Sequence, residues 1–156
     1  MHAVITMQMA DGTESDVHFT ANGATALRFR QVFGRELIES IKNIIDRLGA
    51  KNVATLMQGG VDDMSLESLT PEQLNAVIAV VTSGETNTIS QLAYIMNASA
   101  EKKDMRALDM ESWLDWMEQF ETMEFYTHAM DFIMLYMNNR MTTSIPKKKE
   151  DRLNEK

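Results

Sequence analysis

The sequence has 156 residues and a net charge of −8, with 44% apolar residues, 24% charged residues and no cysteine. This composition is typical of a globular protein whose length suits one domain with a sizeable core, and it argues against a disordered chain. The lack of cysteine excludes a disulfide scaffold, no apolar run is long enough to span a membrane, and the acidic balance disfavours binding to nucleic acid.

The first twenty residues are predicted to form a β-hairpin. Apolar and polar residues alternate over residues 3–9 and again over 16–19, which is the period of a half-buried strand. Asp11-Gly12 between them favours a tight turn, because such turns need backbone conformations with positive φ. A lone hairpin is marginal in water, so it is expected to pack on the helices or to pair with another copy through an open edge. The expected self-association edge comprises Val4, Thr6, Val17 and Phe19.

Three helix signals follow the hairpin. Asn22 is expected to cap a first helix that ends at Gly34, because glycine adopts the left-handed conformation that closes a helix. Residues 70–73 (TPEQ) combine a threonine cap, a proline at the first helical position and a glutamine three residues on, which predicts another helix start. Between the two, an apolar stripe ending at Gly49 predicts a helix, and residues 50–69 are ambiguous, with a loop expected near 59–63. The expected apolar faces are Leu37, Ile41, Ile44, Ile45 and Leu48 for the second helix, and Leu74, Val77, Ile78 and Val81 for the third.

The second half of the chain is also predicted to be helical. Ser83-Gly84 is expected to separate the third helix from one that carries Ile89, Leu92, Ala93 and Met96 on its apolar face. Asp109 is expected to cap a helix that runs through residue 120, and a last helix over 123–137 follows without a clear break. The predicted fold class is therefore mainly α with a small N-terminal β-hairpin (α+β). One compact domain is expected over residues 1–140, with the hairpin at 2–20 and helices at 22–139, and a flexible basic tail is expected over 141–156.

No residue pattern points to catalysis, to a cofactor or to a metal. His2, His18 and His128 are scattered along the chain without the spacing of a metal site, so solvated or singly hydrogen-bonded histidines are the favoured interpretation. Gly59-Gly60 is not followed by the lysine and hydroxyl residue of a phosphate-binding loop. We therefore expect a protein that is not an enzyme, with no catalytic residue, no cofactor and no metal ligand.

Fourteen methionines and two tryptophans direct attention to binding. Methionine fills irregular gaps, so core packing is the simpler interpretation, but flexible thioethers also make a surface that adapts to several partners. Trp113 and Trp116 lie about 300° apart on a helical wheel, so one is expected in the core and the other at its margin or against a partner. The candidate partner-binding residues are Trp113, Trp116, Met117, Phe120, Met123, Met130 and Met134.

The charge of the chain is unevenly distributed. Residues 109–137 contain seven acids and no lysine or arginine, whereas residues 140–156 contain six basic residues and three acids. The acidic side chains are most simply a solvated helix face. They would also complement a basic partner protein, which leaves both interpretations open.

Three blocks of sequence occur in order across most of the chain. Residues 29–38 (FRQVFGRELI) follow the predicted hairpin, residues 92–96 read LAYIM and residues 112–115 read SWLD, and a short lysine-containing C-terminus follows. Together they resemble the aromatic-Arg-x-x-Phe-Gly-x-acidic, Leu-Ala-Tyr-x-Met and Glu/Ser-Trp-Leu-Asp blocks of tail assembly chaperones from long-tailed (siphovirus-type) bacteriophages of Gram-positive hosts. Glu36 stands where that family usually has aspartate, and Asn97 stands where it usually has a small residue.

The resemblance implies a function in virion assembly. Such chaperones act in the host cytoplasm, coat the tape measure protein and keep it soluble until tail-tube subunits polymerise around it, and they are absent from the mature virion. The resemblance together with the open hairpin edge predicts that copies of the chain also associate with one another as a homo-oligomer.

Many members of that family are also made as a longer form by programmed ribosomal frameshifting. Lys147–Lys149 are encoded by AAA or AAG codons, which can form the A-rich heptamer on which ribosomes slip. We therefore expect a longer form that shares most of this chain and whose extension contacts the tail-tube protein. The alternative of a different class is a small acidic helical regulatory or inhibitor protein that binds a basic protein partner.

Overall fold

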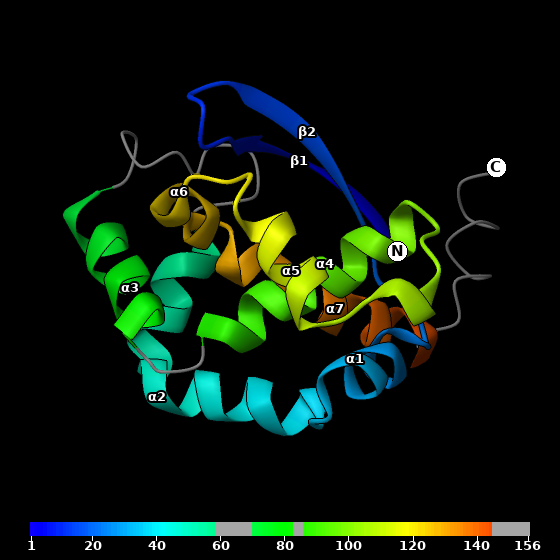
Figure 1. Ribbon diagram of the computed structural model, residues 1–156. Coiled ribbons are helices and arrows are strands. Elements are labelled where there is room, and N and C mark those ends of the chain that lie inside the picture. The colour runs from blue at the N-terminus through cyan, green and yellow to red at the C-terminus, as the bar shows by residue number, and fades with distance from the viewer. Residues whose placement is uncertain (59–69, 83–85, 145–156) are drawn as a thin grey trace, which may run out of the picture.

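The N-terminal hairpin packs on a bundle of helices in the computed structural model, which describes residues 1–58, 70–82 and 86–144 (Figure 1). The predicted fold class, mainly α with a small N-terminal β-hairpin, is confirmed. The elements are β1 (His2–Gln8), β2 (Glu14–Thr20), α1 (Thr25–Phe33), α2 (Leu37–Gln58), α3 (Pro71–Thr82), α4 (Thr86–Ala100), α5 (Met110–Met117), α6 (Thr122–Thr127) and α7 (Ala129–Ser144).

The hairpin is antiparallel, with a register that runs from His2 opposite Thr20 to Gln8 opposite Glu14. Residues of odd number face the helices, and Ile5, Met7 and Phe19 are buried there. The turn is wider than expected, because five residues join the strands and positive φ occurs at Gly12 (88°) and not at Asp11. Asp11 Oδ1 instead accepts hydrogen bonds from the Thr13 N–H (2.9 Å) and from the Thr13 hydroxyl (2.6 Å).

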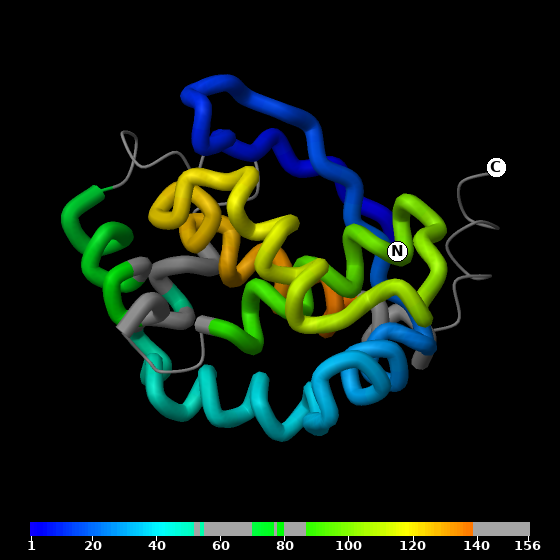
Figure 2. The backbone as a smooth tube through the Cα atoms, viewed as in Figure 1, coloured from blue at the N-terminus to red at the C-terminus, as the bar shows by residue number. Residues whose placement is uncertain are grey.

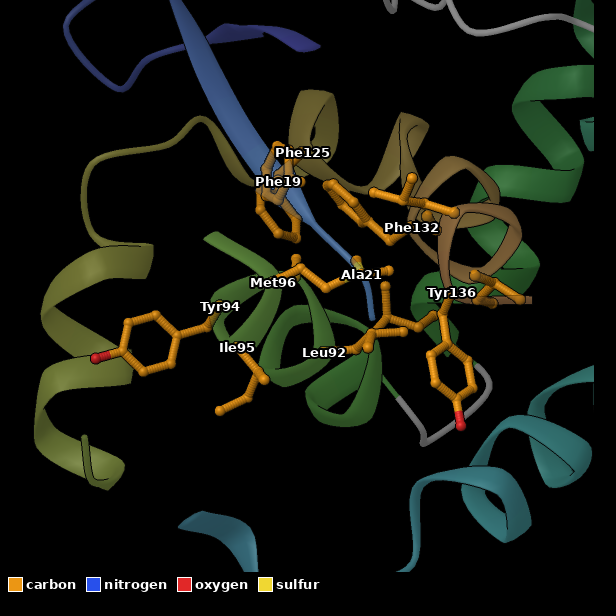
Figure 3. Close-up of a cluster of buried hydrophobic side chains, with 14 of the residues drawn as sticks. Phe19, Ala21, Leu92, Tyr94, Ile95, Met96, Phe125, Phe132 and Tyr136 are labelled. Carbon is orange, nitrogen blue, oxygen red and sulfur yellow. The ribbon is translucent and has the colours of Figure 1, made fainter. Parts of the chain in front are cut away.

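Helix α4 is the centre of the fold. It contacts β2 and the helices α1, α2, α3, α5 and α7, and every residue from 88 to 98 is buried. Figure 3 shows Leu92 and Met96 among Phe19, Phe132 and Tyr136, which come from β2 and α7. The buried surface of this helix is therefore wider than the single apolar stripe that the sequence predicts. Its polar residues are buried as well, and Arg35 holds two of them through hydrogen bonds to Thr88 Oγ1 (3.1 Å) and Gln91 Oε1 (2.6 Å).

The predicted stop of α1 at Gly34 and the predicted start of α3 agree with the structure, and the predicted cap of α1 does not. Gly34 ends α1 with φ 74°, and its N–H donates to the Arg30 carbonyl at 2.8 Å. At α3 the Thr70 hydroxyl accepts the Gln73 N–H (3.2 Å), and the Gln73 side chain accepts the Thr70 N–H (3.0 Å). Asn22 does not cap α1, which begins at Thr25 without a side-chain cap, because the Asn22 side chain accepts the Ala24 N–H within the preceding turn.

The predicted apolar faces of α2 and α3 have different outcomes. The stripe on α2 is confirmed, with its large side chains buried except the exposed Ile45, and Gly49 (φ 78°, ψ 157°) interrupts the helical backbone as expected. The chain then continues as helix to residue 58, so the first part of the ambiguous segment is helical. On α3, Leu74 and Ile78 of the predicted face are 37% and 43% exposed, so these two positions are wrong, and Ala76 is buried instead. The side chains of Val77 and Val81 lie outside those that the structure describes.

The C-terminal helices have other bounds than predicted. Helix α5 ends at Met117, before Phe120, and the single last helix is two helices, α6 and α7, with a non-helical backbone at His128 between them. Residues 141–144 were expected in the tail but belong to α7. The expected loop near 59–63, the break at Ser83-Gly84 and the lysines of the tail lie outside the described residues.

Candidate partner-binding surface

The connection between α5 and α6 pairs with the loop end of the two-stranded hairpin through an isolated β-bridge. Met9 and Phe120 form an antiparallel bridge, the Ala10 N–H donates to the Gln119 carbonyl (2.9 Å), and the Glu121 N–H donates to the Gln8 carbonyl (3.1 Å). Figure 2 shows the hairpin lying along this segment of the chain. These bonds hold the C-terminal end of α5 against the hairpin and so fix which side of α5 faces the core.

Trp116 lies at the centre of an aromatic cluster beneath the hairpin. Its ring centroid is 4.7 Å from that of Phe120, 5.4 Å from Tyr94, 5.9 Å from Phe125 and 6.5 Å from Phe19. Edge-to-face and tilted arrangements at such distances are favourable for aromatic rings. With 6% of its surface exposed, Trp116 is a core residue that joins α4, α5, α6 and β2.

The predicted binding residues are mostly core residues. Trp113 is 5% exposed and packs edge-on against Phe33 at 6.0 Å, so the prediction that one tryptophan faces the margin or a partner is wrong. The physical reason is that α1 covers one flank of α5 and the hairpin covers the other. Trp113, Trp116, Phe120 and Met130 are buried, and Met117, Met123 and Met134 are half-buried, so these seven side chains do not form an exposed surface.

The outward face of α5 carries different residues. Met110 and Leu114, one turn apart, are 51% and 46% exposed. Glu111, Asp115 and Glu118 are exposed beside them, and all five fall within an arc of about 140° at 100° per residue. None of the three carboxylates forms an ion pair with a residue that the structure describes. This face, the α5 outer face, therefore combines apolar area with uncompensated negative charge.

A pocket of about 380 Å³ lies beside the α5 outer face. Its lining includes Tyr94, which is buried and donates from its hydroxyl to Ser112 Oγ at 2.8 Å, and Trp116. The rim contains Lys103, Asp104, Ala107, Leu108, Asp115 and Gln119.

The charges at the rim of the pocket are not all neutralised. Lys103 pairs with Glu101 at 3.2 Å, and Asp104 pairs with Arg106 at 3.2 Å. Hydrogen bonds from the Arg106 backbone and side chain hold the pKa of Asp104 below its usual value. Asp115 has no such partner among the described residues, so the pocket has an aromatic floor and one uncompensated carboxylate at its edge. That combination suits a lysine or arginine side chain.

The predicted self-association edge divides into two parts. The Gln8 carbonyl accepts from outside the hairpin, so the backbone groups of Val4 and Thr6, four and two residues earlier, also point outward from β1. Both side chains are exposed, and no backbone hydrogen bond from another described element reaches Val4 or Thr6, so among the described residues this part of the β1 edge is open. The predicted part on β2 is not an edge: Phe19 is fully buried and Val17 is half-buried, because α4 covers this strand.

Asn97, one of the two residues that depart from the resembled sequence blocks, has a role at this covered strand. Asn97 on α4 is 1% exposed, and its amide Nδ2 donates to the His18 carbonyl at 2.9 Å. The bond satisfies the His18 carbonyl, which points outward from β2. A small residue at position 97 could not donate to it. It also ties the central helix to the hairpin.

Two of the three histidines, which are far apart in the sequence, are brought together by the fold, and both are exposed and hydrogen-bonded. His2 Nε2 and His18 Nδ1 are 3.1 Å apart on the exposed face of the hairpin. His128 lies far along the chain, 3.1 Å from Asp131 Oδ2. The signal that could have found the pair is the hairpin register, since His2 lies opposite Thr20 and His18 is two residues before it. In the described part of the chain, no group of three or more His, Cys, Asp or Glu could hold a metal ion.

Comparisons with protein-family models, with curated proteins and with solved structures find no match to this chain. Within residues 1–58, 70–82 and 86–144, no helix is both long and apolar enough to cross a membrane. The function is therefore inferred from the three sequence blocks and from the surfaces just described.

Proposed function

We propose that this protein is a tail assembly chaperone of a long-tailed bacteriophage, which binds the tape measure protein in the host cytoplasm and keeps it soluble until tail-tube subunits polymerise around it. The observation that carries the proposal is the α5 outer face. Two exposed apolar side chains lie one turn apart beside three carboxylates that form no ion pair with a described residue. This combination matches the needs of an amphipathic helix with a basic edge.

The three resembling sequence blocks support the proposal because they contact one another. Phe33 in the first block packs against Trp113 in the third, with ring centroids 6.0 Å apart. Tyr94 in the second block donates a hydrogen bond to Ser112 in the third at 2.8 Å. Blocks that meet in this way are expected to specify a shared fold, and partner specificity would then be carried by the outward residues around them.

The proposed binding mode follows from the chemistry of the surface. Apolar positions of a tape measure helix pack on Met110 and Leu114, and its basic residues lie over Glu111, Asp115 and Glu118. One lysine or arginine enters the pocket over Tyr94 and Trp116. Because such charge pairs are screened by salt, binding should weaken as ionic strength rises. Several copies would cover a long helix, with contacts between copies through the open edge of β1.

The test is co-expression of the chain with the tape measure protein, read as the soluble fraction of that protein. Leu114→Ser removes apolar area from the α5 outer face and should lower the soluble fraction severalfold. Leu27→Ser is the matched control, since Leu27 is 67% exposed on α1. If wild type leaves the tape measure protein insoluble, the chaperone function is wrong. If wild type solubilises it and both variants do so equally well, the function stands and the assignment of the surface is wrong.

A second candidate is a small acidic regulatory protein that binds a basic protein partner. The observation that favours it is the set of three carboxylates of the α5 outer face that form no ion pair within the described part of the chain, since they would serve a basic partner of any class. Gene context separates the two candidates: a tape measure gene immediately downstream favours the chaperone, and a promoter-proximal regulatory cassette favours the regulator.

A further inference from the structure

The exposed face of the hairpin carries a pair of histidines that the proposed chaperone function does not use. His2 and His18 lie on neighbouring strands, with His2 Nε2 and His18 Nδ1 3.1 Å apart and ring centroids 5.2 Å apart. Both residues are exposed, so ions from solution reach them freely.

The separation of the two nitrogens fits a shared metal ion. Zinc–imidazole bonds are about 2.0–2.1 Å long, so two such ligands at angles between square and tetrahedral have nitrogens about 2.8–3.4 Å apart. The observed 3.1 Å lies inside this range. An ion replaces the hydrogen bond between the rings once the donor ring has changed to its other tautomer, which frees its lone pair, and the rings have turned so that both lone pairs point at the ion. The nitrogen–nitrogen distance need not change.

The Thr20 hydroxyl orients the imidazole of His2. The His2 Nδ1 atom lies 2.8 Å from the Thr20 hydroxyl oxygen. With the proton of the neutral ring on Nδ1 and donated to that oxygen, Nε2 presents its lone pair toward His18. A hydrogen bond at the second ring nitrogen is the usual device that orients a metal-binding histidine and fixes its tautomer.

We propose that His2 and His18 form a binding site for one divalent first-row transition ion, with the two imidazoles as protein ligands and water in the remaining positions. Imidazole nitrogens suit copper, nickel and zinc, and the affinity order among divalent ions places Cu²⁺ first. Calcium and magnesium are excluded as occupants, because they require oxygen ligands.

The site exists only in the folded chain, because sixteen residues separate the two histidines and the hairpin register brings them together. An ion that binds both rings therefore stabilises the folded state, by an amount that grows with the ion concentration relative to its dissociation constant. The ion joins β1 to β2 near the ends of the strands where the N-terminus lies.

The full chain tests the site, with Cu²⁺ and Zn²⁺ alone as probes. We expect one Cu²⁺ per chain by calorimetry, electron paramagnetic resonance showing two coordinated imidazole nitrogens, and a rise in the melting temperature with Zn²⁺. His18→Gln and His2→Gln should each weaken binding at least tenfold and abolish the Zn²⁺-dependent rise. Both residues are exposed, so circular dichroism should show that each variant remains folded.

The amino group of Met1 offers a competing arrangement, in which it binds Cu²⁺ together with the adjacent His2. That arrangement does not use His18. If His18→Gln binds Cu²⁺ as tightly as wild type, or if wild type binds neither ion, the two-histidine site is wrong. Thr20→Val adds a positive test, since loss of the hydrogen bond at His2 Nδ1 should weaken binding severalfold while both ligands remain.

Discussion

Trp116→Ala should destabilise the protein strongly and should not act as a simple binding variant. A buried tryptophan covers about 150–250 Å², and truncation of Phe or Trp to Ala in a core costs about 3–5 kcal/mol. Trp116 is 6% exposed and has four aromatic neighbours with ring centroids within 6.5 Å, which places it toward the upper part of that range. We expect a loss of about 4 kcal/mol in the free energy of unfolding. For a chain of this size the melting temperature should then fall by roughly 8–16 °C.

Urea unfolding followed by circular dichroism measures this loss as a shift of the midpoint at unchanged slope. Leu114→Ala on the same helix is the matched control, because Leu114 is 46% exposed and its truncation should change the free energy of unfolding by only about 0.5 kcal/mol. Trp116→Phe retains an aromatic ring and should recover more than half of the loss. If Trp116→Ala unfolds at the same urea concentration as wild type, Trp116 is not a core residue and the packing around α5 described above is wrong.

Three smaller effects follow from the turns and caps. Gly34→Ala should lower the free energy of unfolding by about 1 kcal/mol, because φ is 74° at this position while the space around a new Cβ is open. An unchanged urea midpoint would contradict the left-handed conformation. Asp109→Ala should lower the free energy of unfolding by about 1 kcal/mol, because Asp109 and Ser112 cap α5 reciprocally. Asp109→Asn should recover most of that loss, and equal losses in the two variants would contradict the capping role. The side-chain and backbone hydrogen bonds of Thr13 lower the pKa of Asp11 from its ordinary 3.8, so Asp11 stabilises the fold above that value and loses this effect as pH falls through the lower folded pKa. Urea midpoints measured from pH 5 to pH 2 should therefore fall less steeply for Asp11→Ala than for wild type, and parallel curves would contradict the prediction.

Features set by local chemistry could be predicted from the sequence. The capping residues Thr70, Gln73 and Asp109 and the helix stop at Gly34 act within a few residues of themselves, so their effect does not depend on the rest of the fold. The hairpin is equally local, because its strands are joined by five residues and each has the alternation of one buried face. The prediction of a tight turn at Asp11-Gly12 is wrong, because β1 ends at Gln8 and β2 begins at Glu14, which leaves a loop of five residues.

Features set by tertiary packing could not be predicted in the same way. Helix α4 has polar residues such as Thr88, Gln91 and Asn97 at positions where an amphipathic helix would meet solvent, yet all three are buried. Their hydrogen-bond partners, Arg35 and the His18 carbonyl, are more than fifty residues away in the sequence. No periodicity in α4 itself reveals those partners. The same holds for α3, where the small Ala76 faces the core because neighbouring elements approach closely.

The candidate binding residues were misplaced because residue type does not distinguish a core anchor from an interface anchor. Tryptophan, phenylalanine and methionine are favoured in both environments. Trp113 and Trp116 differ by about 300° on the helical wheel, but that angle equals 60° in the other direction, which is narrow enough for one buried face to hold both. Once the hairpin and α1 have covered that face, Met110 and Leu114 are the apolar residues of α5 that remain exposed. Stability and partner binding should therefore separate on one helix: Trp116→Ala should impair folding, and Leu114→Ser should impair binding in a folded protein.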